Sequence, residues 1–237
     1  RSQEVMDELL RLDSLLKALF VQVDTQIGME NVVVVMTGDH GVMPLVETLE
    51  AEGIDARRAT PGILRDAIDE ALNDRYGETS GFVSQVRRYG DGVYLNTALI
   101  ADRGIEPSEV AQLVVAALMK TGLVAAAYTQ NELVSGNDSE DPYIGLYRNS
   151  FFSSRSPDIS IRLQPYVYME NFSTGTGHGT PYDDDRHVPI VLMGTGVRPG
   201  TYTLESGPED IAPTLARILG LEYPREPDTR ILSEALR

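Results

Sequence analysis

Hydrophobic residues recur along this chain with two kinds of spacing, and together these predict alternating helices and strands. Apolar residues at steps of three and four predict helices with one buried face at residues 5–19, 61–77, 107–122 and 211–220. Short apolar or alternating runs predict strands at residues 32–36, 93–95, 124–128, 159–163 and 188–193. Pro61 and Pro107 stand where a first helical turn tolerates proline, and Gly77 and Gly122 stand where a helix ends.

The order of these elements predicts an α/β fold. Residues 32–36 read Val-Val-Val-Val-Met, a run typical of a strand that is buried on both faces in a parallel sheet. We therefore expect a mostly parallel central sheet flanked by helices. The elements between residues 80 and 165 are shorter and alternate more, as in 159–163, which predicts a half-buried strand. We assign residues 1–79 and 166–237 to the core and residues 80–165 to an inserted or cap-like α+β subdomain.

Composition excludes several classes of function. The 237 residues include 36 acidic and 20 basic side chains, a formal net charge of −16. That balance argues against a nucleic-acid-binding surface and against adsorption to an anionic membrane. The absence of cysteine excludes disulfides, thiolate nucleophiles and iron–sulfur clusters within this sequence. No apolar run reaches the ~18 to 20 residues of a membrane span. The chain begins with Arg1 and enters a helix almost at once, so we expect it to be a piece of a longer protein.

Two loops carry candidate metal ligands. Asp39 and His40 follow the Val-rich strand, and Gly38 and Gly41 beside them permit a sharp turn that could bring both side chains to one ion. His178 lies between two glycines in a second loop. Each loop also has a simpler interpretation. The first is a helix-capping Asp beside a surface His, and the second is an ordinary flexible loop.

The remaining candidates favour structural roles. Residues 183–185 are three consecutive aspartates, which could bind a cation but are more typical of a solvated acidic turn. His187 precedes an apolar strand, which favours a structural hydrogen bond over a metal bond. The glycine loop lacks the Gly-Lys-Ser/Thr sequence of a phosphate-binding loop, and no Gly-x-Ser-x-Gly motif occurs.

Residues 37–41 (Thr-Gly-Asp-His-Gly) after a Val-rich strand resemble a metal motif of the alkaline phosphatase superfamily. Residues 178–182 (His-Gly-Thr-Pro-Tyr), Asp185 and residues 187–189 (His-Val-Pro) resemble the second motif of that superfamily, and residues 210–214 (Asp-Ile-Ala-Pro-Thr) resemble its closing segment. The resemblance is strongest to phosphate-irrepressible alkaline phosphatases and to the type I phosphodiesterase and nucleotide pyrophosphatase group. It implies two zinc ions. Asp39 and His40 would bind the ion that activates the nucleophile, and His178 the ion that holds the leaving-group oxygen.

The resemblance also implies parts that this sequence lacks. The nucleophile, a Thr or Ser, and the other metal ligands would precede Arg1, so no catalytic residue is assigned in this chain and we expect it to be inactive alone. A catalytic zinc takes three protein ligands, whereas the matched motifs supply two for one ion and one for the other. Three functions stay open: a C-terminal portion of a metal-dependent phosphoester hydrolase, a non-catalytic binding or interaction module, and a sister activity such as a phosphodiesterase or sulfatase.

The implied substrate is a phosphate ester, and the implied location is the periplasm or the outside of the cell. The net charge of −16 repels such a substrate at long range. Attraction would therefore depend on bound cations and on donors close to the site.

Overall fold

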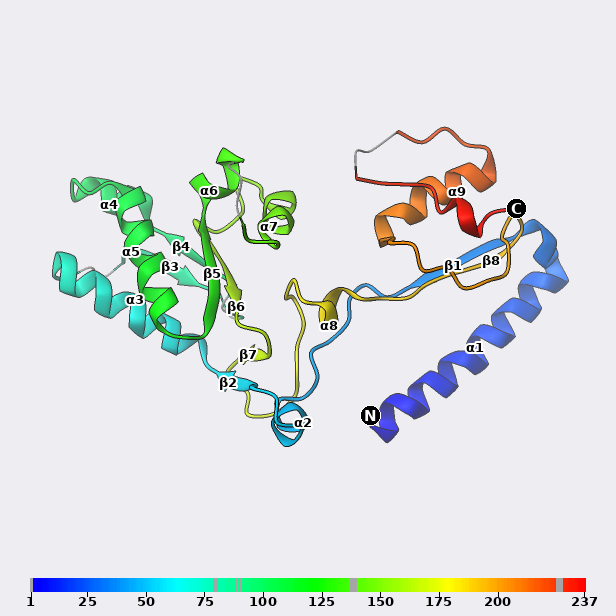
Figure 1. Ribbon diagram of the computed structural model, residues 1–237, viewed down its shortest axis with the longest axis horizontal. Helices are drawn as coiled ribbons and strands as arrows, with labels where there is room; N and C mark the ends of the chain where they lie inside the picture. Colours follow the sequence, from blue (N-terminus) through cyan, green and yellow to red (C-terminus); the bar gives the residue numbers. More distant parts are fainter. Residues whose placement is uncertain (1, 79–80, 88, 90, 137–139, 225–227) are drawn as a thin grey trace. The chain divides into compact units, whose positions relative to one another are not determined.

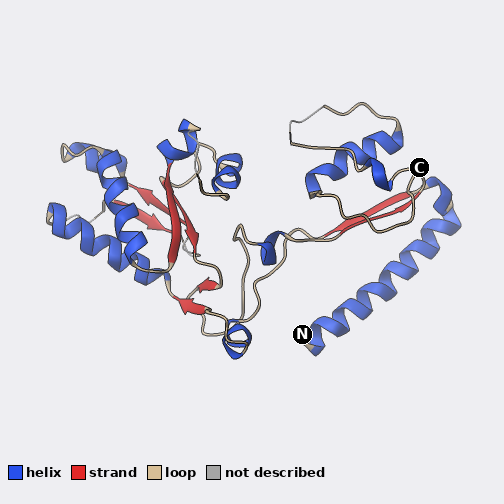
Figure 2. Cartoon of the chain, viewed as in Figure 1, coloured by secondary structure: helices blue, strands red, loops and turns tan. Residues whose placement is uncertain are grey.

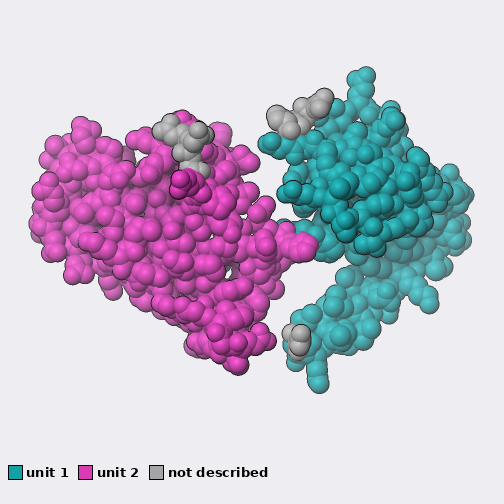
Figure 3. Space-filling model, viewed as in Figure 1, with its two compact units in different colours: residues 1–39, 188–237 teal, residues 40–187 magenta. Residues whose placement is uncertain are grey.

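The computed structural model describes all residues except 1, 79–80, 88, 90, 137–139 and 225–227 (Figure 1). The chain forms two compact units, residues 1–39 with 188–237, and residues 40–187, which Figure 3 colours separately. Both units contain helices and strands in alternation (Figure 2), which confirms the predicted α/β class. None of the helices in the described part of the chain is long and apolar enough to cross a membrane.

The first unit contains two longer helices, one pair of strands and short 3-10 turns. Its elements are α1 (Gln3–Ile27), η1 (Met29–Asn31), β1 (Val33–Thr37), β8 (Ile190–Gly194), η2 (Pro208–Asp210), α9 (Ile211–Leu219) and η3 (Ser233–Ala235). Strands β1 and β8 pair antiparallel, with Val33 opposite Gly194. Gly194 has φ +109°, and a Cβ there would overlap the Val32 carbonyl oxygen, so only glycine fits this end of the ladder.

Helix α1 is present as predicted, but its apolar face is not buried. The side chain of Ser2 caps the helix by accepting a hydrogen bond from the Val5 N–H at 3.1 Å, and Gly28 ends it with φ +82°. No α1 residue that the structure describes is buried, and Val5 and Leu9 are 59% and 56% exposed. Periodicity identifies the face of a helix that can pack, but it does not supply the element that covers it.

The segment at residues 210–214 has a structural role in the first unit. The buried Asp210 carboxylate accepts hydrogen bonds from the N–H groups of Gly207 and Arg230 at 3.1 and 2.8 Å. The Thr214 hydroxyl oxygen accepts one from the Leu232 N–H at 2.9 Å. These bonds attach the C-terminal segment to the start of α9.

The second unit contains most of the regular structure. Its elements are α2 (Val46–Ala51), β2 (Arg57–Ala59), α3 (Pro61–Tyr76), β3 (Val83–Val86), β4 (Gly92–Leu95), α4 (Thr97–Asp102), α5 (Pro107–Lys120), β5 (Val124–Thr129), α6 (Gln130–Ser135), α7 (Ile144–Ser150), β6 (Ile159–Leu163), β7 (Val167–Met169) and α8 (Asp183–Arg186). Four strands form an antiparallel sheet in the order β3–β4–β6–β5, and β2 pairs parallel with β7.

The expected mostly parallel sheet is wrong for the described strands. Among them, only β2 and β7 run parallel, while β1 pairs antiparallel with β8 and the four-stranded sheet is antiparallel throughout. Strand β1 is partly buried at Val33–Val35 and exposed at its last two residues. A continuous apolar run indicates that both faces of a strand can be buried. It does not determine whether the neighbouring strands pair with it in parallel or antiparallel.

The core of the second unit lies between the antiparallel sheet and helices α3 and α5 (Figure 1). The two helices contribute fully buried residues at the predicted spacing, and the strands contribute the opposing layer. The most buried members include Leu64, Ile68, Leu72, Phe82, Ile100, Val110, Val114, Leu118, Val93 and Ile159. Both predicted helices are confirmed, from their first-turn prolines to the positive-φ Gly77 and Gly122 beyond their ends.

Strand β6 differs from the half-buried strand that its alternation predicts. Its polar positions are covered too: Ser160 is 8% exposed, and Arg162 is partly buried. Arg162 is accommodated because its guanidinium forms an ion pair of 2.7 Å with Asp141. The alternating residues of β6 therefore face two covered environments. One face packs in the apolar core, and the other face is polar and contains the paired Arg162, rather than facing solvent.

The predicted inserted subdomain lies entirely within the second unit. The four-stranded sheet and helices α4 to α7 fall between residues 83 and 163, and α2, α3, β2, β7 and α8 join them in the same unit. The assignment of residues 1–79 and 166–237 to one core domain stays a prediction. The polar residues 135–141 predict a loop, and residues 137–139 of it lie outside the described part of the chain.

Candidate metal centre

Two of the three histidines lie face to face in the second unit. The imidazole rings of His40 and His178 are stacked, with centroids 3.5 Å apart and planes inclined by 13°. Nδ1 of His40 lies 2.7 Å from the Gly41 carbonyl oxygen. Because a carbonyl can only accept, Nδ1 carries the proton in this hydrogen bond, which leaves Nε2 as the nitrogen with a lone pair. That is the arrangement of a metal-binding imidazole oriented by a backbone carbonyl.

Backbone hydrogen bonds join the two loops around this pair. The Gly41 N–H donates to the Asp185 carbonyl oxygen at 2.6 Å, and the Met43 N–H donates to the Gly177 carbonyl oxygen at 3.1 Å. The Thr176 hydroxyl donates to the Met43 carbonyl oxygen at 2.5 Å. A Cβ on Gly41 would overlap the Asp184 carbonyl oxygen. The close approach of the two loop segments, at Gly41 and at Asp184, thus requires glycine at position 41.

Asp185 holds the second loop against α8. Its side chain is 4% exposed, and Oδ2 accepts hydrogen bonds from both the N–H and the hydroxyl of Thr180 at 2.6 Å each. Its other oxygen, Oδ1, is buried without a hydrogen-bond partner among the residues described. The interpretation of residues 183–185 as a solvated turn is therefore wrong for Asp185. The only sequence signal for this role was its place in the second motif.

The neighbouring Asp184 is half-buried, and its burial raises the pKa of its carboxyl group. The carboxylates of Asp185 and Asp183 raise that pKa further. Asp183 itself is exposed. The three aspartates thus occupy three environments within one turn of helix.

A buried polar network supports the far end of the second loop. The hydroxyl of Tyr182 accepts a hydrogen bond from Arg162 at 3.2 Å and donates one to the Leu163 carbonyl oxygen at 2.6 Å. Arg162 also pairs with Asp141, which accepts a hydrogen bond from the Tyr128 hydroxyl at 2.7 Å. Burial raises the pKa of Tyr128 to about 12. Sequence reasoning missed this network because its members are scattered along the chain.

Arg58 supports the glycine-rich part of the loop. Its guanidinium forms two hydrogen bonds with the Glu47 carboxylate, at 2.6 and 2.9 Å, and donates to the Gly175 carbonyl oxygen at 2.8 Å. It also lies 5.1 Å from the centre of the Tyr168 ring. The hydrogen bonds from Arg58 lower the pKa of Glu47 to about 2. The loop around His178 is thus attached to β2 and α2.

The other sequence candidates are exposed, as His40 and His178 are. Asp39 is exposed and is the last residue of the first unit before His40. His187 is exposed, and its N–H donates to the Asp183 carbonyl oxygen at 2.9 Å.

The donor chemistry of this site fits zinc, which accepts imidazole nitrogen and carboxylate oxygen. The described residues bring two imidazoles together, but they contain no group of three or more His, Asp or Glu side chains placed to share one ion. A catalytic zinc takes three protein ligands. The two imidazoles of the described residues are thus fewer than the ligands that a catalytic zinc takes.

Comparison with known proteins gives relatives along nearly the whole chain, although no family model matches it. A protein of Myroides odoratus named calcium-transporting ATPase is 31% identical over 94% of this chain and 40% of its own length. Alkaline phosphatase PafA of Elizabethkingia meningoseptica is 27% identical over 94% of the chain and 40% of its own length. Alkaline phosphatase PhoV of Synechococcus elongatus is 25% identical over 100% of the chain and 42% of its own length.

The fold agrees with these relatives. The crystal structure of wild-type PafA superposes with a TM-score of 0.87 over 99% of this chain and 44% of the PafA chain, at 24% identity. The chain thus spans about two fifths of the length of the curated relatives that it matches. In sequence and fold the chain thus resembles a C-terminal part of a protein of the alkaline phosphatase superfamily.

Proposed function

We propose that this chain is the C-terminal portion of a metal-dependent phosphoester hydrolase with two zinc ions, and that Asp39, His40 and His178 are metal ligands. One observation carries the proposal, namely the stacked imidazoles of His40 and His178, held together by backbone bonds between their two loops. Both side chains carry nitrogen donors that zinc accepts, and they come from segments far apart in the chain. The alkaline phosphatase relatives give the reaction class.

The roles of the chain's own residues follow from their contacts. His40, with its Nδ1 proton directed to the Gly41 carbonyl, offers Nε2 to an ion. Asp185 and Thr180 keep the second loop rigid, so that His178 holds its position opposite His40. A pair of bound zinc ions would supply the positive charge that stabilises the attacking and leaving oxygens of a phosphoryl group. The nucleophile, a Thr or Ser, and the remaining ligands come from residues outside this chain, which alone is inactive.

The test is the replacement His178→Ala in the full-length protein, assayed with p-nitrophenyl phosphate. We expect activity to fall by orders of magnitude and bound zinc, measured by atomic emission, to fall with it. His187→Ala is the matched control, because His187 is an exposed histidine nine residues further along the chain. Unchanged activity in the His178→Ala protein would refute the proposal.

The same preparation separates the sister activities. A phosphomonoesterase cleaves p-nitrophenyl phosphate faster than its bis ester, and a phosphodiesterase shows the reverse preference. A protein that folds and cleaves neither ester is a non-catalytic module on the same fold. That alternative is favoured because the described residues contain no group of three or more His, Asp or Glu side chains placed to share one ion. We further propose that the protein acts in the periplasm or outside the cell, in keeping with the resemblance.

A further inference from the structure

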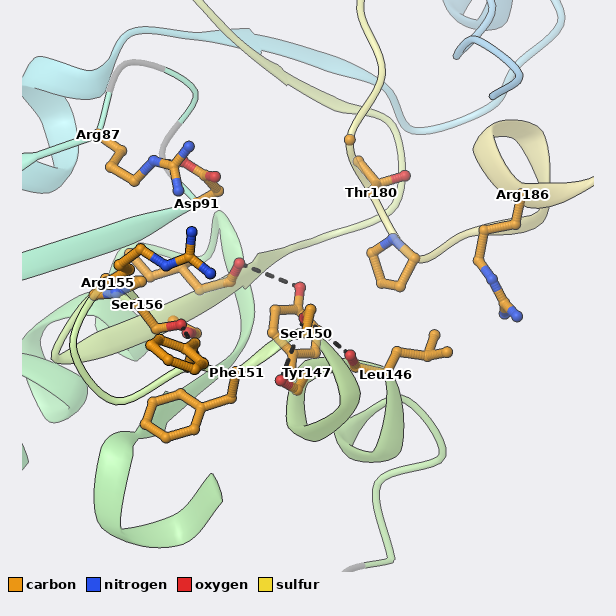
Figure 4. Close-up of a pocket in the computed structure, with 16 residues that line it drawn as sticks. Arg87, Asp91, Leu146, Tyr147, Ser150, Phe151, Arg155, Ser156, Thr180 and Arg186 are labelled. Carbon is orange, nitrogen blue, oxygen red and sulfur yellow. Dashed lines mark hydrogen bonds and ion pairs between the residues drawn. The ribbon is translucent and has the colours of Figure 1, made fainter. Parts of the chain in front are cut away.

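A cavity of about 590 Å³ opens in the second unit (Figure 4). Its walls come from the loop between β3 and β4, from α7 and the residues that follow it, from β6, from residues 179–181 and from the end of α8. All of these elements belong to one compact unit. The proposed metal ligands Asp39, His40 and His178 do not line this cavity. A ligand bound here would therefore be recognised by other side chains than those of the proposed metal site.

The charged side chains of the lining are mostly basic. Arg87, Arg155 and Arg186 line the cavity, and among its described lining residues Asp91 is the one carboxylate. Asp91 pairs with Arg87, at 3.2 Å. Arg155 follows α7 and Arg186 ends α8, and Figure 4 shows them on opposite sides of the cavity. The lining thus keeps two positive charges in a chain whose formal net charge is −16, which favours an anionic ligand.

Arg155 presents a guanidinium without a counter-charge. The guanidinium lies 4.8 Å from the centre of the Phe152 ring, and the Arg155 backbone carbonyl accepts a hydrogen bond from the Tyr94 hydroxyl at 2.9 Å. No carboxylate in the described part of the chain forms an ion pair with this side chain, which is exposed. Because a guanidinium is planar, it can bind a carboxylate by two parallel hydrogen bonds while one of its faces rests on an aromatic ring.

Two hydroxyl groups of the lining can donate hydrogen bonds to a ligand. Ser160 is 8% exposed, yet none of the described residues forms a hydrogen bond with its hydroxyl. A buried hydroxyl without a partner costs free energy, so such groups are rare in folded proteins. The Ser156 hydroxyl oxygen accepts a hydrogen bond from the Phe152 N–H at 2.9 Å, and no described residue accepts its proton. Both hydroxyls are therefore available to an anion in the cavity.

Aromatic rings supply the apolar part of the lining. They belong to Tyr147, Phe151 and Phe152. A volume of about 590 Å³ falls within the range of roughly 300 to 1,000 Å³ that is typical of sites for small organic ligands. An inorganic anion would leave most of this space and all three rings unused. A ligand that matches both the rings and the arginines has an aromatic body and a negative group.

We propose that this cavity binds a small aromatic carboxylate, with Arg155 as the partner of its carboxylate and with the Ser156 and Ser160 hydroxyls as further donors. The carboxylate is the negative group chosen here because its plane matches that of the guanidinium. The ligand is bound without reaction. The inference goes beyond the proposed function and does not rest on it, since binding in this cavity requires neither metal ions nor a nucleophile.

The test is calorimetric titration of the full-length protein with 2-naphthoate. Arg155→Gln removes the charge and keeps a polar side chain, and we expect the Kd for 2-naphthoate to rise about tenfold, as for the loss of a charge-assisted hydrogen bond. Arg103→Gln is the matched control. Arg103 also lies over a phenylalanine ring, at 5.9 Å from the centre of Phe82, but it does not line the cavity. The Kd of this control should stay within about twofold of that of the unaltered protein.

Ser160→Ala separates binding from folding. The Ser160 hydroxyl has no partner among the described residues, so its removal should leave the urea midpoint of the protein unchanged. The same change removes a donor to the ligand, and we expect the Kd for 2-naphthoate to rise about threefold. A lower urea midpoint with an unchanged Kd would contradict the role given to this hydroxyl.

An absence of 2-naphthoate binding, or equal Kd values in Arg155→Gln and in the unaltered protein, would overturn the inference. Inorganic phosphate that binds as tightly would overturn it too, by showing a simple oxyanion site. Equally tight binding of the uncharged 2-naphthol would show a merely apolar pocket. Hydrolysis of p-nitrophenyl phosphate tests the proposed function separately. Binding of 2-naphthoate without hydrolysis supports the cavity and contradicts that function, whereas hydrolysis without binding does the opposite.

Discussion

Replacing Asp185 by alanine removes the carboxylate that joins the His178 loop to α8. Its Oδ2 accepts two hydrogen bonds from Thr180, each 2.6 Å long, and the side chain is 4% exposed. A hydrogen bond to a charged group contributes roughly 1.5 to 3 kcal/mol. Because both bonds share one oxygen, we take the lower figure for each, which gives about 3 kcal/mol of local stability lost.

The assay is hydrogen exchange of the Thr180 amide, which donates directly to Asp185. A loss of about 3 kcal/mol in the free energy of local opening corresponds to roughly 100-fold faster exchange, since about 1.4 kcal/mol is a factor of ten. Mass spectrometry of a peptide covering residues 176–186 in the full-length protein measures this rate. Asp185→Asn keeps an acceptor without the charge, so we expect an intermediate increase of about tenfold.

The matched control is Asp183→Ala, which removes an exposed carboxylate from the same short helix. The Thr180 amide of the Asp183→Ala protein should exchange at the same rate as in the unaltered protein. Protection of Thr180 that survives in the Asp185→Ala protein would refute the reasoning. An equal effect from Asp183→Ala would do so as well, because it would indicate a general effect of charge on α8.

Three further predictions concern the same loops. Gly41→Ala should abolish p-nitrophenyl phosphate hydrolysis by the full-length protein, because a Cβ overlaps the Asp184 carbonyl; Gly62→Ala, in the first turn of α3 with ordinary space for a Cβ, should leave activity unchanged. Arg58 lowers the pKa of Glu47 to about 2, so its stabilisation is complete above the unfolded pKa near 4.5 and disappears as the pH falls toward 2. Urea unfolding between pH 2 and 6 should therefore depend less on pH in Glu47→Gln, and an unchanged dependence contradicts this pairing. Tyr182→Phe leaves the Leu163 carbonyl without its 2.6 Å donor and should lower the free energy of unfolding by about 1 to 2 kcal/mol; a urea midpoint equal to that of the unaltered protein would show that water replaces the hydroxyl.

The exposed apolar face of α1 illustrates one limit of a pattern-based analysis. Leu9 and Leu12 are 56% and 46% exposed, although their spacing is that of a packed helix. Propensity and periodicity are local, whereas burial requires a second surface. The direction of strand pairing is beyond the same analysis, and the expected parallel sheet proved mainly antiparallel in the described residues.

The sequence by itself determined the helices at α3 and α5, because their apolar spacing, first-turn prolines and terminal glycines all act within a few residues. It also located the two loops that carry His40 and His178. Only the tertiary structure decided that the two rings stack at 3.5 Å, that Asp185 is buried on Thr180, and that Arg155 faces a cavity. The stacked rings come from residues far apart in the chain. The free energies of such contacts depend on distance and burial, which only the folded chain sets.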